Sequence, residues 1–193
     1  FGDYQMPITV RAEILPTATF DGLTIRKSSI ESRDFTLAYD GYLSASSEGQ
    51  LSGEGQIEVD EFSLRKWLRA GNWPVPDTQN LERLSRLSIN TGIKLSNEIM
   101  SLRPFSLILD ETSIDGRIDL SLRPLNVDLE LLADKLNLDS YLSSNPSAQT
   151  GSSTTQFPLV TGTYKLDVGQ LTISNHLLNQ VGFDLGIGSD EIT

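Results

Sequence analysis

The chain has 193 residues, of which 15 are Lys or Arg and 26 are Asp or Glu, so its formal net charge is −11. This acidic balance argues against a nucleic-acid-binding protein, because such proteins neutralise phosphates with basic residues. The chain has no cysteine, which excludes disulfides, thiolate metal sites and a cysteine nucleophile.

Alternating apolar and polar residues run through most of the chain; residues 8–14, for example, read Ile-Thr-Val-Arg-Ala-Glu-Ile. A sheet with one dry face and one wet face requires this period of two. The short turn sequences Asp21-Gly22, Asp40-Gly41 and Arg123-Pro124 favour antiparallel neighbours. The sequence therefore predicts a mainly β chain, with strands in residues 8–14, 35–39, 51–59, 87–95, 105–109, 114–122, 125–131, 164–168, 171–173 and 181–187.

Residues 63–86 interrupt this pattern with two short helical signals. Ser63 is a suitable N-cap for a helix that places Leu64, Trp67 and Leu68 on one face and stops at Gly71. After two prolines, Asp77 or Thr78 is a suitable cap for a second helix, whose apolar stripe is Leu81, Leu84 and Leu87. We expect this pair to cover one end or edge of the sheet.

Residues 143–158 are rich in Ser, Thr and Gln and almost uncharged, which is typical of a flexible loop. Too few residues follow them for a separate domain, so residues 1–193 are expected to form one elongated β-rich region. A weak repeat, Gly-polar-apolar-polar-apolar-polar, begins at Gly55, Gly116 and Gly162. Its unequal spacing indicates a reused hairpin unit in which a glycine at each strand start lets the chain bend.

The sequence contains no motif that indicates catalysis. A single histidine, His176, cannot form a histidine triad or a multi-histidine metal site and is interpreted as a polar turn residue. The densest acidic group, Asp110, Glu111, Asp115 and Asp119, lacks the spacing of a calcium loop and resembles the wet face of a strand. We therefore predict that the chain is not an enzyme and has no cofactor or metal. A pair of carboxylates for sugar hydrolysis stays open, because such pairs meet only in space.

Five basic residues are concentrated in the helical segment: Arg65, Lys66, Arg69, Arg83 and Arg86. A solvated helix face is the first interpretation. The alternative is a contact with anionic headgroups at a membrane surface.

Neither a membrane-spanning run nor a signal peptide is recognisable in the sequence. The chain starts without Met and stops just after a strand-like run, so it is interpreted as a piece of a longer protein whose anchor lies elsewhere.

Residues 53–142 resemble part of the AsmA family of Gram-negative envelope proteins. In residues 53–68 a glycine-led strand runs into a short helix, which the Pro- and Thr-containing residues 74–78 follow. Residues 107–116 are similar to the family's L-x-L-D-x-T-x-(apolar)-x-G pattern, and residues 134–142 to its Leu-Asp-Leu-Asp-x-Tyr-Leu signature, with Asn137 in place of an aspartate. Residues 162–173 fit the next element of the family. Turn and cap chemistry explains the marker residues Asp110, Asp139 and Tyr141 without a catalytic role.

The resemblance implies a periplasmic segment tethered to the inner membrane by an N-terminal helix and linked to outer-membrane assembly. Relatives such as TamB are linked to phospholipid movement between the two membranes, through a long, curled antiparallel sheet that forms an open, taco-like groove. A sheet with few helices leaves part of its dry face uncovered, and such a surface calls for a ligand or partner.

The first functional hypothesis is therefore a groove that binds or conducts phospholipid acyl chains, with headgroups at its wet rim. Its candidate lining residues are Ile114, Ile118, Leu120, Val127, Leu129, Leu166 and Val168. An ordinary packed core is the alternative for each of them. A second hypothesis is a structural module whose sheet edges dock other envelope proteins. A glycan-acting enzyme is the last.

Overall fold

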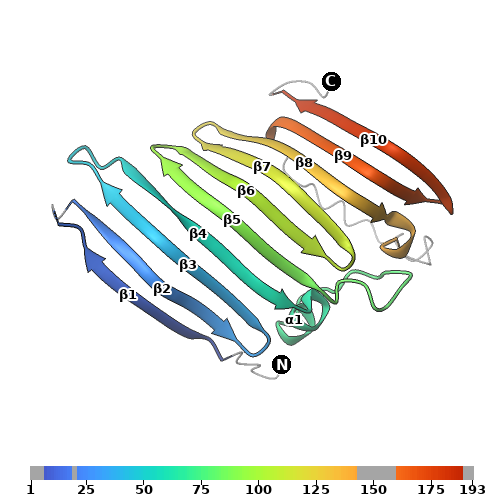
Figure 1. Ribbon diagram of the computed structural model, residues 1–193, viewed down its shortest axis with the longest axis horizontal. Coiled ribbons are helices and arrows are strands. Elements are labelled where there is room, and N and C mark those ends of the chain that lie inside the picture. The colour runs from blue at the N-terminus through green and yellow to red at the C-terminus, as the bar shows by residue number, and fades with distance from the viewer. Residues whose placement is uncertain (1–6, 19–20, 143–159, 189–193) are drawn as a thin grey trace.

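A computed structural model describes residues 7–18, 21–142 and 160–188. They form a single ten-stranded sheet that is curled and not closed, with the strands in chain order from β1 to β10 (Figure 1). The prediction of a mainly β chain with a curled, open sheet is confirmed. The strands are β1 (Thr9–Pro16), β2 (Gly22–Ser32), β3 (Phe35–Ala45), β4 (Leu51–Phe62), β5 (Leu87–Ser96), β6 (Ile99–Leu109), β7 (Thr112–Leu122), β8 (Leu125–Asn137), β9 (Thr161–Ile173) and β10 (His176–Ile187).

One strand pair departs from the expected antiparallel order. All neighbours pair antiparallel except β8 and β9, which are parallel. A parallel neighbour requires a connection that returns the chain from the end of β8 to the border of the sheet at which β8 begins. It begins with the 3-10 turn η1 (Leu138–Ser140). The loop expected at residues 143–158 lies outside the described residues.

Strand β2 was not predicted from the sequence, because a bulge breaks its alternation of apolar and polar residues. The register with β3 shifts between Ile25 and Ser28, and Lys27 has a positive φ of 50°. Inward and outward positions therefore exchange halfway along the strand. Two other details of the sequence analysis are wrong: Asp40-Gly41 lies within β3 instead of a turn, and Gly55 and Gly116 lie in the middle of their strands instead of at the start.

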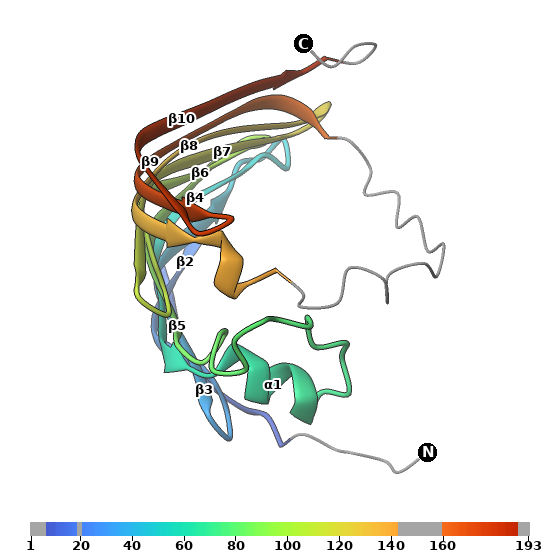
Figure 2. The same cartoon turned by 90° about the vertical axis from the view of Figure 1, so that its right-hand side faces the viewer.

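The strands bend at mid-length, where glycines and bulges form a row across the sheet. Gly41 pairs with Gly55, and Gly116 pairs with Phe105 beside a bulge in β6. A Cβ on Gly116 would lie 2.1 Å from the carbonyl oxygen of Glu130, so only glycine permits this approach of the two strands. Figure 2 shows the result, a sheet curled into an open gutter. Bulges and glycine kinks are the usual source of such curvature.

This bend predicts a large difference between two glycine substitutions. We expect Gly116→Ala to lower the free energy of unfolding by about 1–3 kcal/mol, because the added methyl group forces β7 and β8 apart. Gly182→Ala in β10 is the control, since its Cβ would meet only a carboxylate oxygen of Asp167 at 3.1 Å. Urea denaturation of both variants measures the difference, and equal effects would contradict this account of the bend.

Only the first of the two expected helices forms. Helix α1 (Leu64–Ala70) is capped by Ser63, whose hydroxyl accepts a hydrogen bond from the amide of Lys66, and ends at Gly71. Residues 77–86 form turns instead of the second expected helix, because Leu84 has a positive φ of 62° and its amide bonds to the side chain of Asp110. The expected apolar stripe fails with it, since Leu81 is 72% exposed.

Helix α1 identifies which sheet face is concave. It lies inside the curl (Figure 2), and Trp67 contacts the rings of Phe35 in β3 and Phe62 in β4, with centroids 5.8 and 6.2 Å apart. Phe35 and Phe62 therefore point into the concavity, and strand register assigns their neighbours to the same face. In the part of the chain that the structure describes, the core is small: the buried apolar residues are Val59, Phe62, Leu84, Ala133, Val168 and Leu171.

Candidate functional site

The concave face of the sheet is apolar, and the described residues leave most of it uncovered. From β3 to β7, the inward positions that the register aligns include no charged residue. Most of them are neither buried nor fully exposed, as expected for side chains that line an open gutter. The principal inward residues are Leu37, Tyr39, Leu43, Ile57, Ile93, Leu95, Met100, Leu102, Phe105, Leu107, Ile118, Leu120, Val127, Leu129 and Leu131.

The two long borders of the gutter differ. One border, which we call the open lip, carries the connections between strands at residues 17–18 and 21, 46–50, 97–98 and 123–124. The opposite border carries α1, the turns up to residue 86 and η1, which lie over the concave side (Figure 2). The described segments thus cover the apolar face from one border only.

A hollow of about 330 Å³ opens between β3, β4 and β5 on the concave face. Its lining includes Leu37, Leu43, Ile57 and Leu95, with Tyr39 beside them. The ring of Tyr39 packs over Gly55 and occupies the space that a side chain there would need, since a Cβ on Gly55 would lie 2.6 Å from that ring. Burial, and then the charge of Asp40, raises the pKa of the Tyr39 hydroxyl. Sequence analysis did not predict this hollow. The glycines at positions 41 and 55, which pair across β3 and β4, are the feature of the sequence that could have indicated it.

The candidate lining residues all lie on the inward face but in two different environments. Val168 is 1% exposed and forms a core cluster with Ala133 and Leu171, against which Ile114 and Leu166 pack. These three candidates therefore belong to packed protein near η1. The other four, Ile118, Leu120, Val127 and Leu129, pair across β7 and β8, are half-buried and lie outside that cluster.

Asp110 ties the covering segments to the sheet. This side chain, 5% exposed, lies in the β6–β7 turn and accepts hydrogen bonds from the amides of Leu84, Ser85 and Arg86 at 2.9, 2.9 and 3.2 Å. The hydroxyl of Tyr141 donates to it at 2.7 Å. Burial opposes ionisation of Asp110, but these hydrogen bonds outweigh it and lower the pKa of the carboxyl.

The other two marker residues also have structural roles. Burial and the carboxylate of Asp110 raise the pKa of Tyr141, whose ring lies 5.4 Å from the guanidinium of Arg83. Asp139 accepts hydrogen bonds from the amides of Ser174 and Asn175 and so fastens the β9–β10 turn. Sequence analysis expected local turn and cap chemistry for Asp110, Asp139 and Tyr141, whereas their hydrogen bonds join segments more than twenty positions apart in the chain.

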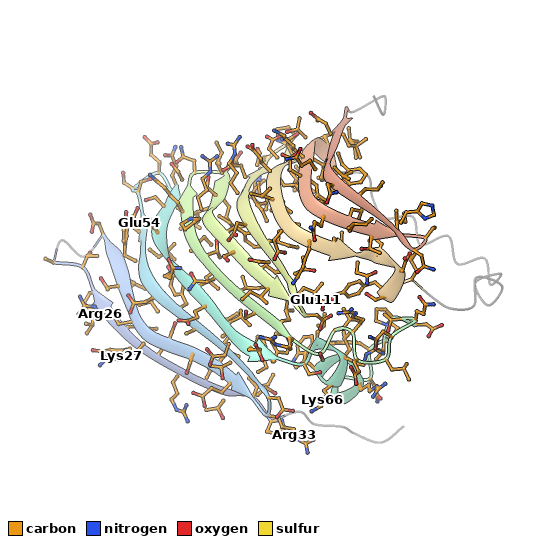
Figure 3. All side chains as sticks on the ribbon, turned by 45° about the vertical axis from the view of Figure 1, so that its right-hand side comes forward. Arg26, Lys27, Arg33, Glu54, Lys66 and Glu111 are labelled. Atoms are coloured by element: carbon orange, nitrogen blue, oxygen red, sulfur yellow. The ribbon has the colours of Figure 1, made fainter. Side chains whose placement is uncertain are left out.

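The five basic residues do not form one solvated face. Arg65 is buried and donates to Thr78 and to the carbonyl oxygen of Arg83, so its interpretation as a solvated residue is wrong. Arg83 pairs with Glu111, and Arg86 with Glu61 at 2.7 Å. Lys66 and Arg69 on α1 fit the prediction of a solvated helix face, since both are exposed, whereas Arg86 is exposed but lies after the helix. Figure 3 shows Lys66 and Arg33 at the same border of the sheet.

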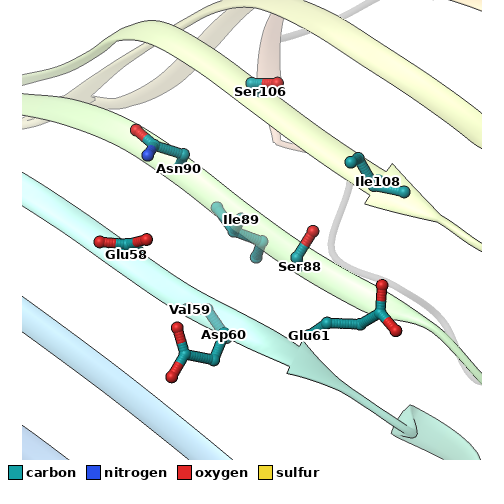
Figure 4. Close-up of a pocket in the computed structure, with 9 residues that line it drawn as sticks. All are labelled: Glu58, Val59, Asp60, Glu61, Ser88, Ile89, Asn90, Ser106 and Ile108. Atoms are coloured by element: carbon teal, nitrogen blue, oxygen red, sulfur yellow. The ribbon is translucent and has the colours of Figure 1, made fainter.

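The convex face is polar and crossed by ion pairs. Arg103 pairs with Asp119, and Arg117 with Glu130 at 2.8 Å. A shallow hollow on this face, of about 280 Å³, is lined by polar and acidic side chains that include Glu58, Asp60 and Asn90 (Figure 4). Ile108 is an apolar exception at its edge.

The acidic group of the sequence analysis is dispersed by the fold. Asp110 binds backbone amides, Glu111 pairs with Arg83, Asp119 pairs with Arg103, and Asp115 is exposed. Within residues 7–18, 21–142 and 160–188, no cluster of three or more His, Asp or Glu side chains is placed to hold a metal ion. His176 is exposed beside the β9–β10 turn, as a polar turn residue would be.

The molecule thus belongs to the class of open, curled β-sheets with an apolar concave face and a polar convex face. Comparison with known protein families, curated proteins and solved structures found no match. Among the described residues, no helix is both long and apolar enough to cross a membrane.

Proposed function

We propose that this chain is a non-enzymatic periplasmic segment of an AsmA-like protein that binds or conducts phospholipid acyl chains along its concave face. The observation that carries the proposal is the apolar gutter, which residues 7–18, 21–142 and 160–188 leave open. An apolar surface of this extent is unfavourable in water and indicates a ligand or partner. The family resemblance of residues 53–142 supplies the envelope setting and the class of lipid.

The dimensions of the gutter suit acyl chains. Ten strands at about 4.8 Å spacing give a length of about 43 Å along the axis that crosses the strands. Each methylene group removed from water contributes roughly 0.8 kcal/mol, so a chain lying along the inward side chains gains much of its binding energy from burial alone. Headgroups stay hydrated if they project through the mouth beside the open lip.

Direct extraction of lipid from the purified chain tests this function. We expect native mass spectrometry to show phospholipid at a defined stoichiometry, and organic extraction to recover it. Incubation with labelled phospholipid vesicles provides a second route to the loaded state. A chain that stays free of lipid in both experiments would show that the described sheet does not bind acyl chains by itself.

A second candidate function rests on the sheet edges. Every residue of β1 is exposed, including Val10 and Ile14, as is Ile8 just before it. Much of β10 is exposed too. Unpaired strand edges template the addition of another strand. A structural module that docks envelope proteins in this way would have a dry interior and no bound lipid. A glycan-acting enzyme is the third hypothesis. Carboxylates are absent from the inward face between β3 and β7 and lie instead in the hollow on the convex face.

A further inference from the structure

Two segments far apart in the sequence join into one bridge over the concave side. We call them together the strap: residues 79–86, which follow α1, and residues 138–142, which follow β8. The amide of Gln79 donates to the carbonyl oxygen of Leu142 at 2.8 Å, and the amide of Asn80 donates to that of Ser140 at 3.3 Å. The strap therefore walls the gutter opposite the open lip.

Polar contacts hold the 79–86 part of the strap to the sheet. The carboxylate of Asp110 accepts hydrogen bonds from the amides of residues 84–86 and from the hydroxyl of Tyr141, so one side chain holds both parts of the strap. Ion pairs of Arg83 with Glu111 and of Arg86 with Glu61 add to this. Of residues 79–86, Leu84 is the buried apolar residue, whereas Leu81 is 72% exposed. Segments with few buried apolar contacts open at a lower free energy than the surrounding sheet.

We infer that residues 79–86 of the strap are a detachable wall of the groove, and that Asp110 is their fastener. Residues 138–142 stay with the sheet, because Leu138 packs against the core cluster. Docked on them, residues 79–86 narrow the mouth through which lipid enters and leaves. Released, residues 79–86 widen that mouth while the sheet, whose strands pair independently of them, stays folded. This inference rests on the proposed function for the lipid that passes, and it adds the element that controls passage.

Tyr141→Phe loosens the fastener with the smallest chemical change, the loss of one hydroxyl. We expect the amides of Leu84, Ser85 and Arg86 to exchange with deuterium about tenfold faster in this variant, since a hydrogen bond to a charged group is lost. A fluorescent phosphatidylethanolamine bound to the chain should leave severalfold faster for unlabelled vesicles of phosphatidylethanolamine and phosphatidylglycerol. Ser46→Ala is the control, because it removes a hydroxyl that caps the β3–β4 turn at the open lip.

A covalent lock gives the reverse experiment. The chain has no cysteine, so Gln79→Cys and Leu142→Cys supply the only thiols, at positions that the Gln79–Leu142 hydrogen bond places side by side. A short bis-maleimide that joins them should slow lipid release severalfold, and it should cancel the effect of Tyr141→Phe.

The outcomes separate the two proposals. If neither the cross-link nor Tyr141→Phe changes the rate of lipid release, the detachable wall is wrong, whereas the proposed lipid groove is not affected. Exchange of residues 84–86 only together with β5 and β6, through global unfolding, also overturns the detachable wall. Absence of bound lipid in the unaltered chain overturns the proposed function, and the wall with it.

Discussion

Ile118→Asp should abolish lipid binding and leave the fold intact. Ile118 lies on the inward face of β7, between Leu102 of β6 and Leu129 of β8, and is half-buried. A carboxylate there keeps contact with water in the empty gutter but would be buried without a partner beneath an acyl chain. We expect the lipid recovered by extraction to fall more than tenfold, with a change in melting temperature of only a few degrees.

Two matched substitutions bracket this result. Ile108→Asp places the same charge on the outward face of β6, where Ile108 is 40% exposed, and should leave lipid binding unchanged. Val168→Asp puts the charge into the core cluster. We expect it to prevent folding, because a fully buried, unpaired carboxylate lowers the free energy of unfolding by about 4–5 kcal/mol or more. If Ile118→Asp aggregates or loses its cooperative thermal transition as Val168→Asp does, the surface around Ile118 is ordinary core.

Asp110→Ala should be the most destabilising substitution outside the apolar core. It leaves the amides of residues 84–86 and the hydroxyl of Tyr141 without their acceptor, and it places alanine at a φ of +53°. We expect a loss of about 3–4 kcal/mol in the free energy of unfolding. For a chain of this size that corresponds to a decrease in melting temperature of roughly 6–16 °C. Asp115→Ala, at an exposed carboxylate in the same stretch of sequence, should change stability by less than about 0.5 kcal/mol.

The pH dependence of the free energy of unfolding provides a second test of the role of Asp110. Its pKa is lower in the folded chain than the ordinary value of about 3.9 in the unfolded chain. Its ionised form therefore stabilises the fold above about pH 4, and this contribution is lost as the pH falls toward the folded pKa. The Tyr141 pKa is raised, so its contribution is present below about pH 10 and is lost in stronger alkali. Asp110→Asn keeps one acceptor oxygen and tolerates positive φ, yet it should flatten the acid side of the stability profile. An unchanged acid slope would show that the charge of Asp110 contributes nothing.

Most of the strands could be predicted from the sequence because alternation is a local consequence of one dry face and one wet face. The runs 114–122 and 125–131 fall within β7 and β8, and Ser63 and Gly71 bound α1. The prediction of a second helix failed because Leu84 lies in a turn, where its amide donates a hydrogen bond to the distant side chain of Asp110. Strand β2 was not predicted because its bulge exchanges the inward and outward positions and so breaks the alternation.

The candidate site shows the same division. The sequence determined which residues share the inward face, because side chains alternate across a strand whatever the strand packs against. It did not determine which of them are covered. Val168 and Ile118 are equivalent in the pattern, yet the packing of β8, β9 and η1 buries the first, and the second lines the gutter. The parallel β8–β9 pair and the hydrogen bonds that converge on Asp110 were decided by tertiary structure alone. Each depends on contacts between residues more than twenty positions apart, such as Val127 with Gly162 and Asp110 with Tyr141, and the local alternation of the sequence does not indicate such contacts.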